Sequence, residues 1–110
     1  MANTFKNKLV GSIGTGATDV YTAGSGVTAT AIGLTVANRT SSNITVDVLV
    51  VDTSASVTNY LVKTAPVLVG GSLVAIGGNQ KLVLEVGDKI QVLSSASSSA
   101  DAILSVLEIT

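Results

Sequence analysis

The side chains that most often carry out chemistry in proteins are missing from this sequence. Its 110 residues include no histidine and no cysteine, so the commonest general base and the usual ligands of zinc are both absent. Catalysis by Ser-His-Asp or Cys-His groups is therefore excluded. We expect a protein that is not an enzyme and that needs no cofactor.

The acidic residues are the remaining candidates for acid–base or metal chemistry. Asp47 and Asp52 flank one predicted strand, but their spacing places them on opposite faces of an extended chain. Asp52–Ser54 lacks the glycine of the Asp-Thr-Gly motif of aspartic proteases, and it favours a turn that ends the strand. Calcium could be bound by oxygen ligands alone, but the sequence has no D-x-D cluster. We expect Asp88 and Asp101 to serve as turn residues, and we predict no metal site.

Two other motif matches have structural explanations. Gly24–Ala29 fits the G-x-G-x-x-A pattern of nucleotide-binding proteins, but a strand-like segment follows it, so no helix N-terminus is there to bind phosphate. Asn38–Thr40 and Asn43–Thr45 match the acceptor pattern for N-glycosylation. The N-terminus shows no secretory signal, so we interpret both as loop residues.

Composition indicates the class of partner. Hydrophobic residues make up 46% of the chain, charged residues only 12%, and the formal net charge is −1. Such a chain offers no basic surface for nucleic acid, and no apolar run approaches the roughly 18 residues of a membrane span. We expect neither partner. Low charge with wide apolar strand faces favours self-association, although abundant small Ala and Val residues are also compatible with a monomer.

The elements that would position any site are strands. Apolar and polar residues alternate with a period of two, most clearly in Ile44–Asp52, which is rich in β-branched residues. Asn38–Asn43 is predicted to be a polar hairpin loop, and Gly87-Asp88 a tight turn between two strands. The other predicted strands are Phe5–Ile13, Val20–Thr22, Val27–Asn38, Val57–Val62, Leu82–Val86, Ile90–Val92, Ala102–Ile109 and, as an edge strand or crossing segment because of Pro66, Ala65–Val69.

Short strands separated by regular turns are typical of β-sandwiches and barrels. We therefore predict an all-β fold, a single-domain antiparallel β-sandwich of jelly-roll or Ig-like type with about eight strands. The domain covers residues 1–110, and residues 1–8 are expected to form a flexible N-terminal arm.

Apolar strand residues are the candidates for contact with a partner. The arm and the apolar last strand, Ile103–Ile109, are the elements that we expect to make such contacts. The alternatives are terminal disorder for the arm and an ordinary core role for the last strand. The predicted interface residues are Phe5, Leu49, Val51, Val83, Leu104 and Val106.

Three groups of segments resemble a known family. They are Val36–Val48 with its polar loop, Ala65–Leu73 with Pro66 and two glycines, and Lys81–Val92 together with Leu104–Ile109. These segments resemble small β-sandwich virion structural proteins, of the decoration or accessory type, from tailed bacteriophages, particularly those that infect marine bacteria and cyanobacteria.

The resemblance implies a subunit that binds a symmetric shell or tube in many copies. It implies a capsid decoration or cement protein, made in the host cytoplasm and located in the virion. Its partners would be copies of itself and other virion proteins, such as the major capsid subunit or neck and tail subunits. One alternative is a neck, tail or fibre-associated subunit. Another is a receptor- or glycan-binding β-module, which is weakened by the presence of only two Tyr, one Phe and no Trp.

Overall fold

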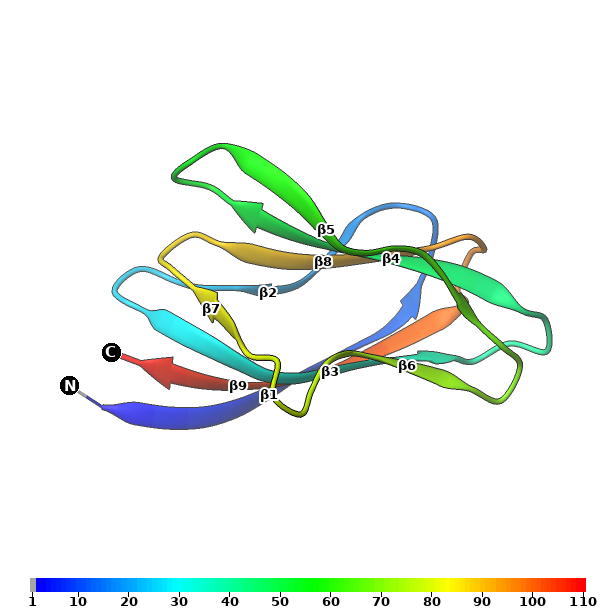
Figure 1. The fold of residues 1–110 in the computed structure, drawn as a ribbon, viewed down its shortest axis with the longest axis horizontal. Helices are drawn as coiled ribbons and strands as arrows, with labels where there is room; N and C mark the ends of the chain where they lie inside the picture. The colour runs from blue at the N-terminus through cyan, green and yellow to red at the C-terminus, as the bar shows by residue number, and fades with distance from the viewer. Residues whose placement is uncertain (1) are drawn as a thin grey trace.

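The computed structural model describes residues 2–110, which form nine β-strands in two antiparallel sheets (Figure 1). Sheet A has the order β1-β9-β3-β6, with β7 also paired to β3, and sheet B has the order β2-β8-β4-β5. No helix in this range is long and apolar enough to cross a membrane. The strands are β1 (Asn3–Ile13), β2 (Thr18–Thr22), β3 (Thr28–Asn38), β4 (Ile44–Asp52), β5 (Val57–Val67), β6 (Ser72–Ile76), β7 (Leu82–Leu84), β8 (Lys89–Ser94) and β9 (Ala100–Ile109).

The order of the strands identifies the type of sandwich. β6 and β7 both pair with β3 and are separated only by residues 77–81, so they behave as one interrupted strand. Counted in this way, the first strand pairs with the eighth, the second with the seventh, the third with the sixth and the fourth with the fifth. This arrangement is a jelly roll. It confirms the predicted antiparallel sandwich and selects between the two types that the sequence left open.

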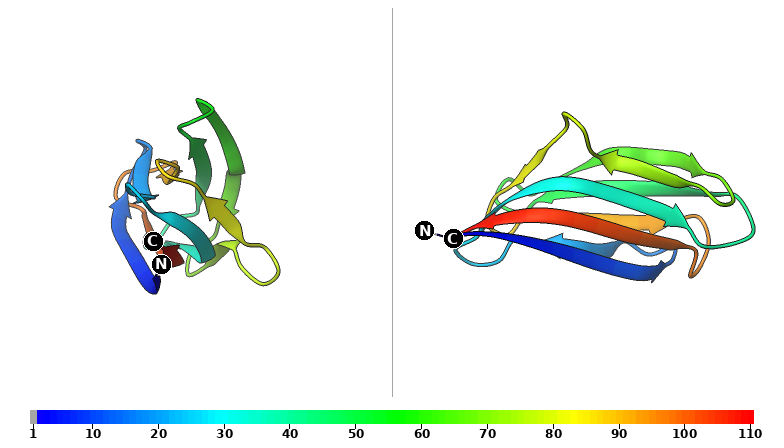
Figure 2. Two further views of the ribbon diagram at one scale, coloured as in Figure 1. Left: turned by 90° about the vertical axis from the view of Figure 1, so that its left-hand side faces the viewer. Right: turned by 90° about the horizontal axis from the view of Figure 1, so that it is seen from below.

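The core is built by the inward-facing residues of both sheets. β9 is hydrogen-bonded to β1 on one side and to β3 on the other, and its residues are alternately buried and accessible. Val46 and Val48 of β4 and Ile90 and Val92 of β8 meet them from sheet B, and all four are fully buried. Figure 2 shows the two layers end-on in its left-hand view. The two-residue period of each strand therefore divides it into a core side and a surface side.

The first crossing loop differs from the sequence-based expectation. Asn38–Asn43 was predicted to be a hairpin loop, which is wrong, because β3 lies in sheet A and β4 in sheet B. The buried Asn38 side chain holds this crossing by donating hydrogen bonds from Nδ2 to the carbonyl oxygens of Ser42 (2.7 Å) and Val67 (3.0 Å). A buried amide with these partners fixes the path of the loop between the sheets.

The turn at Gly87-Asp88 is confirmed, but its two strands do not pair with each other. β7 belongs to sheet A and β8 to sheet B, so this turn also connects the layers. Within residues 2–110, only β4 and β5 are consecutive strands that pair directly. Local alternation predicts that a segment is a strand, but it carries no information about which strand lies beside it.

The N-terminal segment is a strand and not a flexible arm. Residues from Asn3 onward belong to β1, and the pairing with β9 runs from Asn3 opposite Ile109 to Val10 opposite Ala102. Ala2 and Thr110 exchange two backbone hydrogen bonds of 3.0 Å, which brings the two ends of the chain together (Figure 2). Met1 lies outside the described residues. The expected arm over residues 2–8 is therefore wrong.

Pro66 lies where its chemistry predicts. It is part of β5, which occupies an edge of sheet B and pairs with β4 alone within the described residues. Proline cannot donate a ladder hydrogen bond, and an edge strand has one side on which no donor is needed. Ala65–Val67 continues the strand that begins at Val57, so the two segments predicted separately are one element.

Two adjacent residues of β9 test the assignment of alternate strand residues to the core and to the surface. Leu104 is fully buried, whereas Ile103 is 47% exposed. Leu104→Ala is expected to lower the free energy of unfolding by about 2–5 kcal/mol, because it removes buried methyl groups and leaves a cavity. Ile103→Ala, the matched control, is expected to cost less than about 1 kcal/mol. Urea denaturation of both variants measures the difference, and similar losses would contradict the assigned faces.

Candidate interaction surface

The outer face of sheet A carries two rows of paired residues. The rows follow directly from the strand registers, in which directly opposite residues point to the same side of a sheet. In the right-hand view of Figure 2, β3, β9 and β1 lie side by side on this face. The first row is Phe5, Leu107, Thr30 and Val83, across β1, β9, β3 and β7. The second row is Leu9, Ile103, Thr35 and Val74, across β1, β9, β3 and β6.

Five large apolar side chains in these rows are exposed to solvent. A single exposed leucine or valine is ordinary on a protein surface, but a contiguous group on one sheet face marks an interaction site. The exposed fractions are 75% for Phe5, 65% for Leu9, 63% for Val74, 62% for Val83 and 47% for Ile103. We call this set the outer face of sheet A. These five residues are candidates for contact with a protein partner.

The outer face of sheet B has a different chemistry. Gln91 Nε2 donates a 2.7 Å hydrogen bond to Asp19 Oδ1, and Lys89 Nζ lies 3.8 Å from Asp19 Oδ2. These side chains link β2 to β8 on the solvent side. Charged and amide groups of this kind are well hydrated, so this face is suited to remain in water.

The six predicted interface residues separate into three groups. Phe5 and Val83 lie on the outer face of sheet A. Leu49 and Val51 are half-buried on the outward side of β4, beside polar residues of β5 and β8 such as Gln91 and Lys89. The structure brings together only the first pair as part of one exposed apolar surface.

Leu104 and Val106 are core residues. Both are fully buried on the inward side of β9, so a partner cannot reach them while the sandwich is folded. The expectation that Leu104 and Val106 form an interface is wrong. Their neighbours in sequence, Ile103, Ser105 and Leu107, are the residues of β9 that point outward. Because β9 has apolar residues on both faces, its sequence alone does not show which set of alternate residues points into the core.

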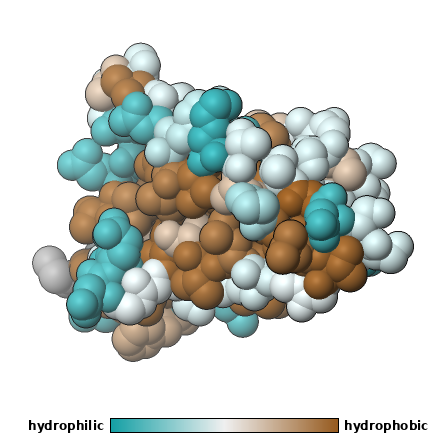
Figure 3. Space-filling model, turned by 45° about the vertical axis from the view of Figure 1, so that its right-hand side comes forward, coloured by the Kyte–Doolittle hydropathy of each residue, from teal (hydrophilic) through white to brown (hydrophobic). Residues whose placement is uncertain are grey.

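A second apolar region lies along the side of the sandwich that carries β5, β6 and β7. Figure 3 shows hydrophobic residues forming a broad band across this side, with hydrophilic residues around it. Leu61, Leu73, Ala75 and Leu82 are half-buried and pack against the core. These four residues therefore extend the margin of the core, whereas Leu68 and Val69, in the connection between β5 and β6, are exposed.

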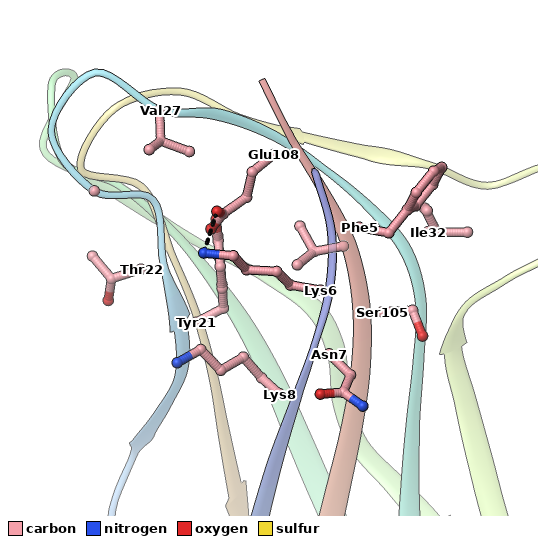
Figure 4. Close-up of a pocket in the computed structure, with 12 residues that line it drawn as sticks. Phe5, Lys6, Asn7, Lys8, Tyr21, Thr22, Val27, Ile32, Ser105 and Glu108 are labelled. Carbon is pink, nitrogen blue, oxygen red and sulfur yellow. Dashed lines mark hydrogen bonds and ion pairs between the residues drawn. The ribbon is translucent and has the colours of Figure 1, made fainter. Parts of the chain in front are cut away.

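An open cleft of about 880 Å³ lies near the end of the molecule where the two termini meet, and Figure 4 shows its lining. Lys6 and Lys8 point to one side of β1, toward Tyr21 of β2, whereas Phe5 points to the other side. Tyr21 Oη donates a 2.6 Å hydrogen bond to Glu108 Oε2, and Lys6 Nζ lies 3.0 Å from Glu108 Oε1. These contacts join the edge of sheet A to the edge of sheet B.

The protonation of this pair follows from its surroundings. Burial, together with the hydrogen bond to Glu108, raises the pKa of the Tyr21 hydroxyl. The hydrogen bond from Tyr21, followed by that from Lys6, lowers the pKa of the Glu108 carboxyl. Both shifts favour a neutral phenol that donates to a carboxylate. The cleft thus contains a structural ion pair in which Tyr21, Glu108 and Lys6 are engaged with one another, and Lys8 also lines it.

Of the two acidic residues expected at turns, Asp88 is found at one and Asp101 is not. Asp101 lies in β9, where its Oδ1 accepts a hydrogen bond from the Ser12 amide (3.0 Å) and pairs with Arg39 (3.2 Å), so it is not a turn residue. Asp88 follows the tight turn as predicted. One carboxylate oxygen each from Asp52, Glu85 and Asp88 lie within 4.8 Å of one another. Sequence analysis missed this group because its members come from two turns that are distant along the chain.

Comparison with known proteins supports the fold. No protein-family model matches the chain, and no curated protein matches it. A solved structure from Bacillus endospore appendages, described as a novel family of disulfide-linked pili, aligns with 98% of this chain and 88% of its own, with a TM-score of 0.58 and 14% identity. At this identity, the likeness shows a shared fold.

The Tyr21–Glu108 contact predicts a pH-dependent stability. The pKa of Glu108 is lowered on folding, so its ionised carboxylate stabilises the fold at pH values above its unfolded pKa of about 4.3. This stabilisation is lost as pH falls through the folded pKa. Tyr21→Phe is expected to cost about 1.5–3 kcal/mol at pH 7, as for a hydrogen bond to a charged group. The difference in the free energy of unfolding between Tyr21→Phe and wild type is expected to become smaller below about pH 4.

Chemical denaturation at pH 7 and pH 3 measures this difference. The matched control is Tyr60→Phe, because Tyr60 is half-exposed and stacks with Lys63 at 4.5 Å, a contact that a phenyl ring can also make. The free energy of unfolding of Tyr60→Phe is expected to be close to that of wild type at either pH. A Tyr21→Phe deficit of the same size at pH 3 as at pH 7 would show that the charged carboxylate is not involved.

Proposed function

We propose that this chain is a non-enzymatic structural subunit that works in many copies, and that it decorates and cements the capsid of a tailed bacteriophage. The observation that carries the proposal is the outer face of sheet A, where five large apolar side chains in two rows of one sheet face are exposed to solvent. The resemblance of the sequence segments to phage decoration and accessory proteins supports the proposed location in the virion.

The difference between the two outer faces gives the proposed orientation. The outer face of sheet A binds the capsid lattice, where burial of apolar area contributes about 25 cal/mol per Å². The outer face of sheet B, with Asp19, Lys89 and Gln91, stays in contact with water. Association entropy offsets much of the gain for one subunit, so a cement protein stabilises its particle through repetition over many copies.

The small inventory of side chains suited to catalysis agrees with a mechanical role. The sequence has neither histidine nor cysteine, and Tyr21, Lys6 and Glu108 in the cleft are joined to one another. Within residues 2–110, the strongest structural feature outside the core is an apolar surface. Such a surface can bind a protein, but it provides no group that transfers protons or attacks a substrate.

A second candidate is a subunit that assembles with copies of itself into a filament or ring, including a neck, tail or fibre component. The likeness in fold to a pilus protein favours this alternative. That protein belongs to a disulfide-linked family, whereas this chain contains no cysteine. Self-assembly of this chain would therefore depend on noncovalent contacts, for which the outer face of sheet A is again the available apolar surface.

Light scattering across a concentration series separates capsid decoration from assembly into an open filament. A capsid decoration subunit is expected to be a monomer or a small closed oligomer whose mass stays constant. A mass that increases without limit as concentration rises indicates heterologous open assembly. That result would contradict capsid decoration and favour the filament.

A pair of valine substitutions tests which face binds the particle. Val83→Lys is expected to weaken binding to empty capsids of the phage that encodes the chain by at least about tenfold, because the interface would bury an unpaired ammonium group. Val57→Lys makes the same change at an exposed valine of β5 in sheet B and is expected to bind as wild type does. Co-sedimentation with capsids measures both, and equal binding by two folded variants would exclude the outer face of sheet A.

A further inference from the structure

We propose that Asp52, Glu85 and Asp88 form a divalent-cation site suited to Ca²⁺. Asp52 is the last residue of β4, whereas Glu85 and Asp88 flank the turn between β7 and β8. One carboxylate oxygen from each residue lies within 4.8 Å of the other two. Oxygen atoms bound to Ca²⁺ at 2.3–2.6 Å can be up to about 5.2 Å apart, whereas those bound to Mg²⁺ are at most about 4.2 Å apart. A separation within 4.8 Å is compatible with Ca²⁺, and a comparison with Mg²⁺ tests the preference.

The second observation is a buried carboxylate oxygen with no hydrogen-bond partner. Asp88 is only 5% exposed, and its Oδ2 accepts a 3.0 Å hydrogen bond from the Glu85 amide. Its Oδ1 is the one buried side-chain polar atom without a partner among residues 2–110. An unpaired buried carboxylate oxygen is costly. A cation bound through Asp88 Oδ1 would satisfy this oxygen.

The cluster also lacks a neutralising charge from the protein. The ion pairs in the described part of the chain are Lys6–Glu108, Arg39–Asp101 and Lys89–Asp19, and none includes Asp52, Glu85 or Asp88. Three carboxylates this close repel one another. A divalent cation would convert this repulsion into attraction, and carboxylate oxygens are the ligands that Ca²⁺ prefers.

The backbone around the site is fixed before any ion binds. The Asp88 amide donates to the Glu85 carbonyl (2.9 Å), and the Gly87 amide donates to the Ala23 carbonyl (2.8 Å). Gly87 has a φ of +87°, a left-handed conformation that favours glycine. Thr53 Oγ1 donates a 2.6 Å hydrogen bond to the Gly87 carbonyl, which ties the β4–β5 turn to the β7–β8 turn. Ligand positions held in this way reduce the cost of binding.

The position of the site indicates what the ion would do. The β7–β8 turn connects sheet A to sheet B, and Asp52 ends a central strand of sheet B. A bound cation would therefore clamp the two layers at this end of the sandwich. A site with three carboxylates and further ligands from water is expected to bind in the range of extracellular calcium modules, about 10⁻⁴–10⁻³ M.

Thermal unfolding and titration calorimetry test the site directly. Protein treated with EDTA and dialysed is titrated with CaCl₂ to about 10 mM, which covers this range of affinity. The wild-type melting temperature is expected to rise by roughly 5 °C when Ca²⁺ reaches about ten times its dissociation constant, with a smaller rise for MgCl₂. Glu85→Gln is expected to lose most of this rise, and Asp88→Asn all of it.

Glu85→Gln keeps the test valid even if Asp88→Asn fails to fold, because Glu85 is exposed. Without Ca²⁺, Glu85→Gln is expected to melt at or above the wild-type temperature, since it removes a like-charge repulsion. Asp19→Asn makes the same change in net charge outside the cluster and is expected to retain the full Ca²⁺ response. The assignment would be overturned if wild type showed neither heat of binding nor a rise in melting temperature with Ca²⁺, or if Mg²⁺ raised the melting temperature equally. It would also be overturned if Glu85→Gln and Asp19→Asn responded to Ca²⁺ in the same way.

Discussion

Strand β9 is hydrogen-bonded to a neighbour on each side, and the rest of the sandwich depends on the strict alternation of its side chains. Its inward residues, Ala102, Leu104 and Val106, are buried and hold sheet A against sheet B. Two of its outward residues, Ile103 and Leu107, belong to the apolar rows that β1, β3, β6 and β7 extend. Core and contact surface are thus two sides of one strand. A substitution at an inward position of β9 is therefore expected to affect stability, whereas one at the adjacent outward position is expected to affect binding.

The all-β fold could be predicted because each strand carries its own local pattern. Ile44–Asp52 was predicted with its observed bounds, and Pro66 indicated an edge strand, because both signals lie within a few residues. Which strands become neighbours is decided by contacts between distant segments. The sequence therefore gave no sign that the loop at Asn38–Asn43 crosses between sheets, or that residues 3–8 would pair with the last strand.

The candidate sites were harder to predict for the same reason. Leu104 and Ile103 look equivalent in the sequence, and only the sandwich distinguishes the buried one from the exposed one. Asp52 and Asp88 were each interpreted correctly as residues near turns, but their proximity requires β4 and the β7–β8 turn to meet at one end of the fold. The outer face of sheet A requires the registers of five strands. Such sites are properties of topology, which a single sequence does not reveal.

Accessibility of single cysteines in the assembled particle tests most directly whether the outer face of sheet A is the contact surface. The chain has no cysteine of its own, so a variant carries one defined thiol. Ser105→Cys lies between the two apolar rows, opposite Asn7 of β1, and Thr58→Cys lies on exposed β5 of sheet B. We expect maleimide to label both thiols in the free subunit and only the Thr58→Cys thiol after assembly. Protection of Thr58→Cys with full labelling of Ser105→Cys would contradict the account.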